Sequence, residues 1–206
     1  MNPVRPHRRG AIVVALAFAA AGAFAQVATV GQPAPAFSAK DTAGKTVSLA
    51  DHTGKFVVIE WTNPDCPFVQ KHYDSGNMPA TQKRALAKGA VWLSVSTDDH
   101  GPKSGAELQS WLKTKTAAPT ALVLDGDGKI GRAYGARTTP HLYIVDPQGK
   151  LVYAGAIDSK PTSNKADIAS AVNYVDHALA EATAGKPISQ AQTRAYGCTV
   201  KYPSAG

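Results

Sequence analysis

Apolar residues in this chain fall into short runs, and the clearest run lies at residues 55–61. Residues 56–59 form a continuous and mostly β-branched stretch, and the turn-forming pair 63–64 follows it. Such a stretch is typical of a strand that is buried on both faces. Cys66 and Pro67 come next, and proline favours the first position of a helix because its φ is fixed and it lacks an N–H. The sequence therefore predicts a strand, a turn and a helix that begins directly after Cys66.

Strand and helix patterns alternate along the rest of the chain. Short apolar runs predict strands, whereas apolar residues spaced by three and four predict helices. This order predicts an α/β fold, a three-layer sandwich with a mixed central sheet. The predicted strands are 55–61, 90–96, 121–124, 141–145 and 151–156, with a short hairpin at 36–49, and the predicted helices are 67–88 (interrupted at 75–77), one capped by Ser104, and 130–135.

The clearest helix pattern lies over residues 165–184. Ile168, Ala171, Val172, Val175, Leu179 and Ala182 would share one face of it, and Gly185-Lys186-Pro187 would end it. The final stretch, QAQTRAYGCTVKYPSAG, has no clear periodicity.

The first 25 residues have the pattern of a secretory signal peptide. Three arginines precede an apolar run at 11–24, which ends in Ala23-Phe24-Ala25. Cleavage is expected before Gln26, and an uncleaved anchor is the alternative. The mature chain, 26–206, would then be a single domain with a C-terminal tail from about residue 186. We expect it in the periplasm or outside the cell, with no membrane span after cleavage.

The charge of the mature chain gives little support for nucleic-acid binding. The leader carries three of the 22 basic residues and none of the 15 acidic ones, so the formal net charge falls from +7 to +4 when it is removed. The remaining basic residues are scattered, with no basic run and no aromatic ladder among them. They are most simply a solvated surface.

Two cysteines, Cys66 and Cys198, remain in the mature chain. At a helix N-terminus, free N–H groups and the helix dipole favour the thiolate of Cys66, which is the nucleophilic form. The alternative is a small buried hydrophobic residue. In an oxidising compartment the two cysteines can form one disulfide. The sequence leaves open whether that bond is a structural staple or cycles between oxidised and reduced states.

The order of elements and two motifs resemble the thioredoxin fold over roughly residues 37–184. WTNPDCPFV occupies the place of the Trp-Cys-x-x-Cys motif, and RTTPHLYIVDPQGKLVYAG resembles the segment with the cis-proline. Within that fold the chain is most similar to the redoxin group, the AhpC/TSA and peroxiredoxin-like proteins. The resemblance implies that Pro140 is cis and that Thr139 presents its backbone to the cysteine. It also implies that Trp61 and Pro67 border the substrate groove.

The chain departs from the family motifs at three positions. Val69 stands where dithiol oxidoreductases have their second cysteine, and Asn63 and Ile59 stand where peroxiredoxins have threonine and proline. These departures argue against efficient peroxidase activity.

The resemblance implies a thiol-dependent oxidoreductase, and the leader pattern predicts that it is exported. Cys66 would attack a disulfide or a peroxide, and Cys198 would resolve the product. We expect Cys66 to face Pro140 and to be open to solvent. A thiol or disulfide partner protein or a small thiol is implied, but no cofactor. Oligomeric state is not defined by the sequence.

Two further residues flank the proline. His141 could act as a proton partner of Cys66, and Arg137 could stabilise a thiolate or an anionic substrate. A rival interpretation is a non-catalytic, disulfide-stapled binding protein, or a copper carrier that uses His72 and His141.

Overall fold

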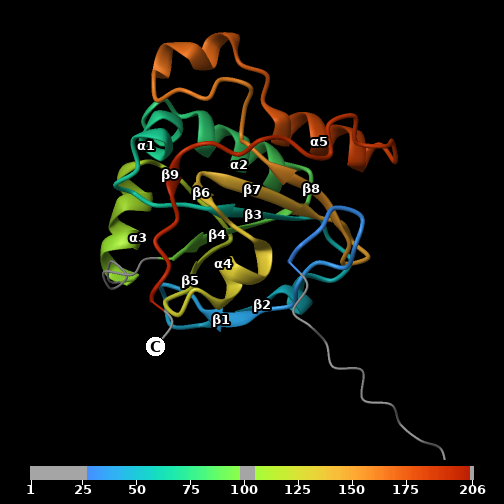
Figure 1. Ribbon diagram of the computed structural model, residues 1–206, viewed down its shortest axis with the longest axis horizontal. Coiled ribbons are helices and arrows are strands. Elements are labelled where there is room, and N and C mark those ends of the chain that lie inside the picture. Colours follow the sequence, from blue (N-terminus) through green and yellow to red (C-terminus); the bar gives the residue numbers. More distant parts are fainter. Residues whose placement is uncertain (1–26, 98–104, 205–206) are drawn as a thin grey trace, which may run out of the picture.

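A mixed five-stranded sheet forms the centre of the computed structural model, which describes residues 27–97 and 105–204 (Figure 1). The strand order is β5-β4-β3-β7-β8; β3, β4 and β5 are parallel, and β7 is antiparallel to β3 and β8. The central strand β3 is buried along its whole length, as its apolar run predicts. The strands are β3 (Val57–Trp61), β4 (Val91–Ser96), β5 (Ala121–Leu124), β7 (His141–Val145) and β8 (Leu151–Gly155).

Helices and a hairpin cover the two faces of this sheet, so the predicted three-layer sandwich with a mixed sheet is confirmed. Four helices pack into the apolar core on one face: α1 (Pro67–Asp74), α2 (Asn77–Ala87), α3 (Gly105–Thr114) and α5 (Tyr174–Thr183). The other face carries α4 (Lys129–Tyr134), the hairpin of β1 (Ser38–Lys40) and β2 (Thr46–Ser48), and the 3-10 turn η1 (Leu49–His52).

Most of the locally encoded elements lie where the pattern predicts them. The interruption at 75–77 separates α1 from α2, where Gly76 adopts a φ of +75°. The 36–49 hairpin lies beside β5, because the N–H of Thr42 donates to the carbonyl oxygen of Leu122 at 2.9 Å. The predicted leader and the capping residue Ser104 lie outside the described residues.

The predicted helix over 165–184 is wrong in its first half. Lys165–Ser170 forms a 3-10 turn, η2, and residues 171–173 are extended before α5 begins. The side chain of Asn173 caps α5 by accepting from the N–H of Asp176 at 3.0 Å. Backbone bonds from Ser159 N–H to Val172 O and from Tyr174 N–H to Ile157 O replace the helical ones. Val172, expected on the buried face, is 44% exposed.

The C-terminal tail packs along the body of the domain. Residues 191–193 pair with Ala154 at the edge of β8, and β9 (Cys198–Thr199) then pairs antiparallel with β6 (Thr138–Thr139). Tyr202 reaches α4, and its hydroxyl donates to Ala136 O at 2.6 Å. Figure 1 draws this tail in red, passing α1 and the end of β3. The tail therefore crosses the end of the sheet at which Cys66 lies.

Candidate active site

Cys66 lies at the N-terminus of α1, as predicted. Its φ of −80° and ψ of 120° are extended, and Pro67 begins the helix. The Cys66 carbonyl oxygen accepts the first helical bond, from the N–H of Gln70 at 2.9 Å. Because the first N–H groups of a helix lack partners within it, this position favours a negative charge on sulfur.

The cis-proline loop lies directly beside that sulfur. The Thr139-Pro140 peptide bond is cis, which confirms the implication of the family resemblance. The Cys66 thiol donates to the carbonyl oxygen of Thr139 at 3.1 Å. The loop that follows α4 and the turn that precedes α1 thus meet at one point, although 73 residues separate the two partners.

Cys198 is brought to the same point by the pairing of β6 with β9. Thr139 and Cys198 are register partners in this two-stranded sheet. Gly197 makes the close approach possible, because it adopts a φ of +139° and a Cβ atom there would collide with the Thr139 carbonyl. Both cysteines are free thiols in this structure.

Cys66 is not open to solvent, which corrects the expectation from the sequence. Its exposed fraction is 2%, and it belongs to the apolar core of the helical face, against which Phe68, Tyr196 and Cys198 pack. Two of these three residues belong to the tail. The sulfur faces Pro140 as expected, but the tail covers it.

The two thiols differ in pKa: that of Cys66 is lowered and that of Cys198 is raised. Burial raises the pKa of Cys66, but hydrogen bonding from the side chains of Cys198 and Thr139 and from the backbone of Val69 and Cys198 outweighs it, so the pKa is lowered overall. Burial and the neighbouring Cys66 sulfur raise the pKa of Cys198 to about 11. Cys66 is therefore the thiol that ionises first and Cys198 the one that keeps its proton.

The sequence matches a known family over most of the domain. The model of the AhpC/TSA family matches residues 30–154, more than half of the 206 residues. The chain belongs to the AhpC/TSA family. Thiol-disulfide oxidoreductase ResA of Bacillus subtilis (strain 168) is 26% identical over 122 residues, which are 59% of this chain and 64% of ResA. The chain thus spans slightly less than two thirds of the length of that relative.

Two solved structures share this fold. An uncharacterised conserved protein from Geobacillus kaustophilus superimposes with a TM-score of 0.73 at 23% identity, covering 86% of this chain and 94% of that one. A hypothetical protein from Sinorhizobium meliloti 1021 gives a TM-score of 0.72 at 20% identity, covering 86% and 96%. These two structural superpositions support the assignment of a thioredoxin-like fold.

Trp61 does not border the groove of this AhpC/TSA protein, which corrects its expected contact with substrate. Its exposed fraction is 0%, and its ring packs against Tyr134 and Tyr143 in the core on the other face of the sheet. The indole N–H donates to Thr97 at 3.2 Å. Trp61 therefore supports the sheet under the site.

The remaining predicted residues lie around the cis-proline. Pro67 is exposed next to Cys66, while Thr139 and Pro140 are buried under the tail. His141 Nδ1 is bonded to Tyr143 Oη at 3.1 Å, and burial followed by the charge of Arg137 lowers the pKa of His141 to about 4. Within the described ranges no hydrogen bond joins His141 to Cys66. The side chain of Arg137 is exposed, and its carbonyl oxygen accepts from Val200 in the tail at 3.0 Å.

The copper alternative gains no support from the arrangement of histidines. Among residues 27–97 and 105–204, no group of three or more His, Cys, Asp or Glu side chains could hold a metal ion. Both ring nitrogens of His72 already have protein partners, Asn77 at 2.8 Å and Tyr196 at 3.1 Å.

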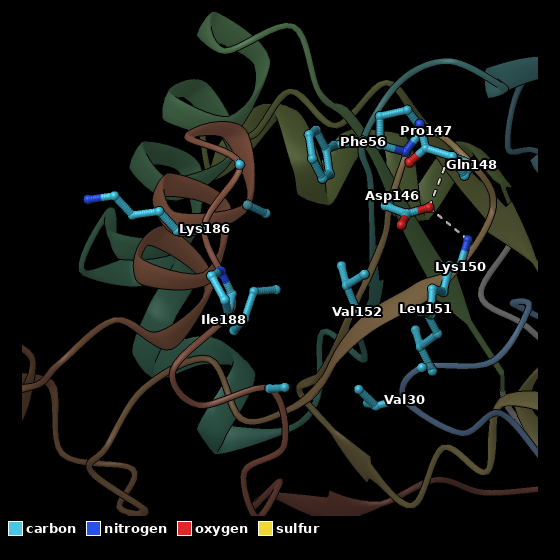
Figure 2. A pocket seen from close by; sticks show the side chains of 15 residues that line it. Val30, Phe56, Asp146, Pro147, Gln148, Lys150, Leu151, Val152, Lys186 and Ile188 are labelled. Atoms are coloured by element: carbon cyan, nitrogen blue, oxygen red, sulfur yellow. Dashed lines mark hydrogen bonds between the residues drawn. The ribbon is translucent and has the colours of Figure 1, made fainter.

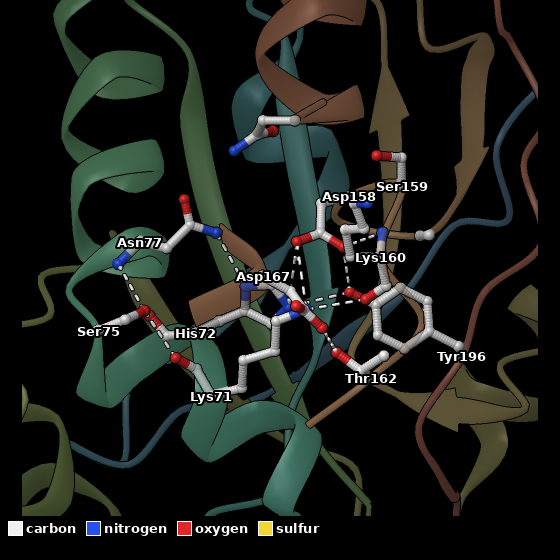
Figure 3. A network of polar contacts seen from close by, with 12 residues as sticks. Lys71, His72, Ser75, Asn77, Asp158, Ser159, Lys160, Thr162, Asp167 and Tyr196 are labelled. Carbon is white, nitrogen blue, oxygen red and sulfur yellow. Dashed lines mark hydrogen bonds and ion pairs between the residues drawn. The ribbon is translucent and has the colours of Figure 1, made fainter. Parts of the chain in front are cut away.

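A buried polar network beside the site was not predicted. It joins Lys71 and His72 of α1 to Asp158 and to Tyr196 of the tail (Figure 3). The spacing of Val69, His72 and Tyr73 signals that His72 faces the core. No local pattern signals Asp158, because its partners come from distant segments.

An apolar cavity at the far end of β3 is remote from the thiols. It has a volume of about 380 Å³ and is lined mainly by apolar side chains, among them Phe56, Val152 and Ile188 (Figure 2). Phe56 precedes β3, whereas Cys66 follows its other end. The cavity contains no cysteine or histidine, so it is separate from the thiol chemistry.

Proposed function

We propose that this AhpC/TSA protein is a thiol-disulfide oxidoreductase in which Cys66 is the nucleophile and Cys198 the resolving thiol. One observation supports the proposal: Cys198 pairs with Thr139 across β6 and β9, and the carbonyl oxygen of that same Thr139 accepts from the Cys66 thiol. Cys198 thereby takes the role of the partner cysteine that Val69 cannot fill.

The reaction is a two-step exchange. The Cys66 thiolate attacks one sulfur of a substrate disulfide, so that a mixed disulfide forms and the other substrate sulfur leaves as a thiolate. Cys198 then loses its proton and attacks the Cys66 sulfur. This step forms the Cys66–Cys198 disulfide and releases the second substrate thiolate. The substrate gains two electrons, and an external dithiol or small thiol returns them to the protein.

The acidities of the thiols suit these separate roles. The lowered pKa of Cys66 keeps an attacking thiolate available for the first step. The raised pKa of Cys198 means that this thiol attacks only after losing its proton, which limits premature reaction with solvent oxidants.

The rival is a permanent staple between the same two cysteines. For a loop of this length a disulfide would stabilise the fold by about 4 kcal/mol. Thiol trapping separates the two: a cycling bond opens in moderate dithiothreitol while the circular dichroism spectrum stays native, and Cys66→Ser abolishes disulfide reduction. A bond that opens only in denaturant supports the staple. A peroxide-consumption assay on the same samples tests whether the Cys66 thiolate also accepts peroxide.

We also propose that the protein works outside the cytoplasm. The support is the leader pattern of residues 1–25 and two cysteines positioned to form a disulfide. In the described part of the chain, no helix has the length and apolar character needed to cross a membrane. N-terminal sequencing of the protein from a periplasmic or secreted fraction should begin at Gln26; an intact Met1 in the cytoplasm contradicts export.

A further inference from the structure

Polar and charged side chains from three segments meet in a buried cluster next to the thiols (Figure 3). Lys71 and His72 lie on α1, one turn and more after Cys66, and their exposed fractions are 1% and 0%. Asp158 follows β8 and is 2% exposed. Tyr196 belongs to the tail and is separated from Cys198 by one residue.

A chain of hydrogen bonds, each from a donor to the next acceptor, leads from Asn77 through His72 and Tyr196 to Asp158. The amide of Asn77 donates to Nδ1 of His72 at 2.8 Å, so the neutral ring carries its proton on Nε2. Nε2 then donates to the Tyr196 hydroxyl oxygen at 3.1 Å, and that hydroxyl donates to Oδ1 of Asp158. Burial lowers the pKa of His72 to about 4, in keeping with a neutral ring.

Asp158 is a fixed anchor for the tyrosine. Its Oδ1 also accepts from the N–H of Lys160 at 2.9 Å, and its Oδ2 pairs with Nζ of Lys71 at 3.5 Å. Nζ of Lys71 donates to the Lys160 carbonyl at 2.8 Å and lies 5.6 Å from the centre of the Tyr196 ring. When Tyr196 leaves, His72 and Asp158 lose a partner inside a buried site, which is costly.

We propose that Tyr196 is a latch that holds the tail over Cys66 and sets the position of Cys198. It is a positioning residue: its hydroxyl touches neither sulfur, but it fixes the chain one residue before Gly197 and two before Cys198. The shielding of Cys66 needs only the tail contact, whereas the effect on disulfide formation rests on the proposed function.

The first test uses alkylation of Cys66 by iodoacetamide in a Cys198→Ser background, where it is the only thiol. Tyr196→Phe should raise the rate about tenfold or more, because hydrogen bonds to charged groups are worth roughly a factor of ten to a hundred. A chain that ends at Ala195 gives the rate for the uncovered site. Tyr134→Phe is the matched control, since it removes a hydroxyl that donates to Pro35 O at 2.9 Å, outside the tail.

The second test uses the chain with both cysteines. Tyr196→Phe should lower the equilibrium constant for the Cys66–Cys198 disulfide against glutathione by the same factor, and Tyr134→Phe should leave it unchanged. The latch is overturned if Cys66 is alkylated in the Tyr196→Phe protein no faster than in the Cys198→Ser protein with Tyr196 intact. The same holds if Cys66 is alkylated no faster in the chain that ends at Ala195, or if Tyr196→Phe fails to fold. Should Cys66 and Cys198 never form a disulfide, the proposed function fails, but the alkylation result still decides the latch.

Discussion

Replacing Gly197 by alanine should release the tail from Cys66. An alanine Cβ would collide with the Thr139 carbonyl, and the φ of +139° disfavours any side chain. Overpacking costs roughly 1–3 kcal/mol and an unfavourable φ about 1 kcal/mol more. Together these come to about 3 kcal/mol against the docked tail, which corresponds to roughly a hundredfold increase in the open fraction. Alkylation of Cys66 in the Cys198→Ser background measures that fraction directly.

Gly149 offers a control that separates backbone strain from the collision. Its φ is +81°, but a Cβ atom would meet nothing within 4 Å, and it lies in the turn between β7 and β8. Gly149→Ala should lower stability in urea by about 1 kcal/mol and leave the alkylation of Cys66 unchanged. If Gly197→Ala alkylates at the rate of Gly149→Ala, the tail is not held by close packing on Thr139, and the reasoning is refuted.

Three other predictions follow from the site and its surroundings. Cys198→Ala should raise the pKa of Cys66, because a side-chain hydrogen bond that lowers it is lost; the pH profile of alkylation measures this, and an unchanged or lower pKa contradicts it. The folded-state pKa of His72, about 4, lies below its unfolded value of 6.5, so the neutral ring contributes fully to stability above pH 6.5. This contribution, about 3 kcal/mol in urea unfolding, is lost as the pH falls towards 4. A ring that titrates near 6.5 by NMR contradicts the prediction. Glu60→Gln should lower the free energy of unfolding by about 1–3 kcal/mol. The buried side chain of Glu60 accepts from Trp92 at 2.9 Å and from Tyr73 at 2.8 Å, and the amide N–H groups of glutamine would face these donors. Unchanged stability in urea contradicts the prediction.

The elements around Cys66 could be predicted because their signals are local. The apolar run of β3, the Cys-Pro pair at the start of α1 and the glycine at 76 each act within a few residues. The break in the predicted 165–184 helix is different, because backbone bonds from residues 157–159 compete with helical bonds there. Apolar spacing carries no information about such a distant competitor.

The burial of Cys66 and the proposed latch both depend on the C-terminal tail, whose partners are also distant in the sequence. β9 has only two paired residues, and its partner β6 lies far away along the chain. Nothing in the spacing of YGCTVKY indicates which edge it will pair with. The proposed role of Cys198 came from the cysteine count and the resemblance, whereas the proposed role of Tyr196 needed the positions of Asp158 and His72 in space.

A redox titration of the native protein shows whether Cys66 and Cys198 form a bond that opens and closes in the folded state. Samples are equilibrated in mixtures of reduced and oxidised dithiothreitol, trapped by alkylation and examined by mass spectrometry, with circular dichroism on each sample. The account predicts a single reversible transition between two free thiols and one Cys66–Cys198 disulfide, with the fold intact on both sides. Cysteines that stay reduced under all conditions, or a bond that opens only when the protein unfolds, would contradict it.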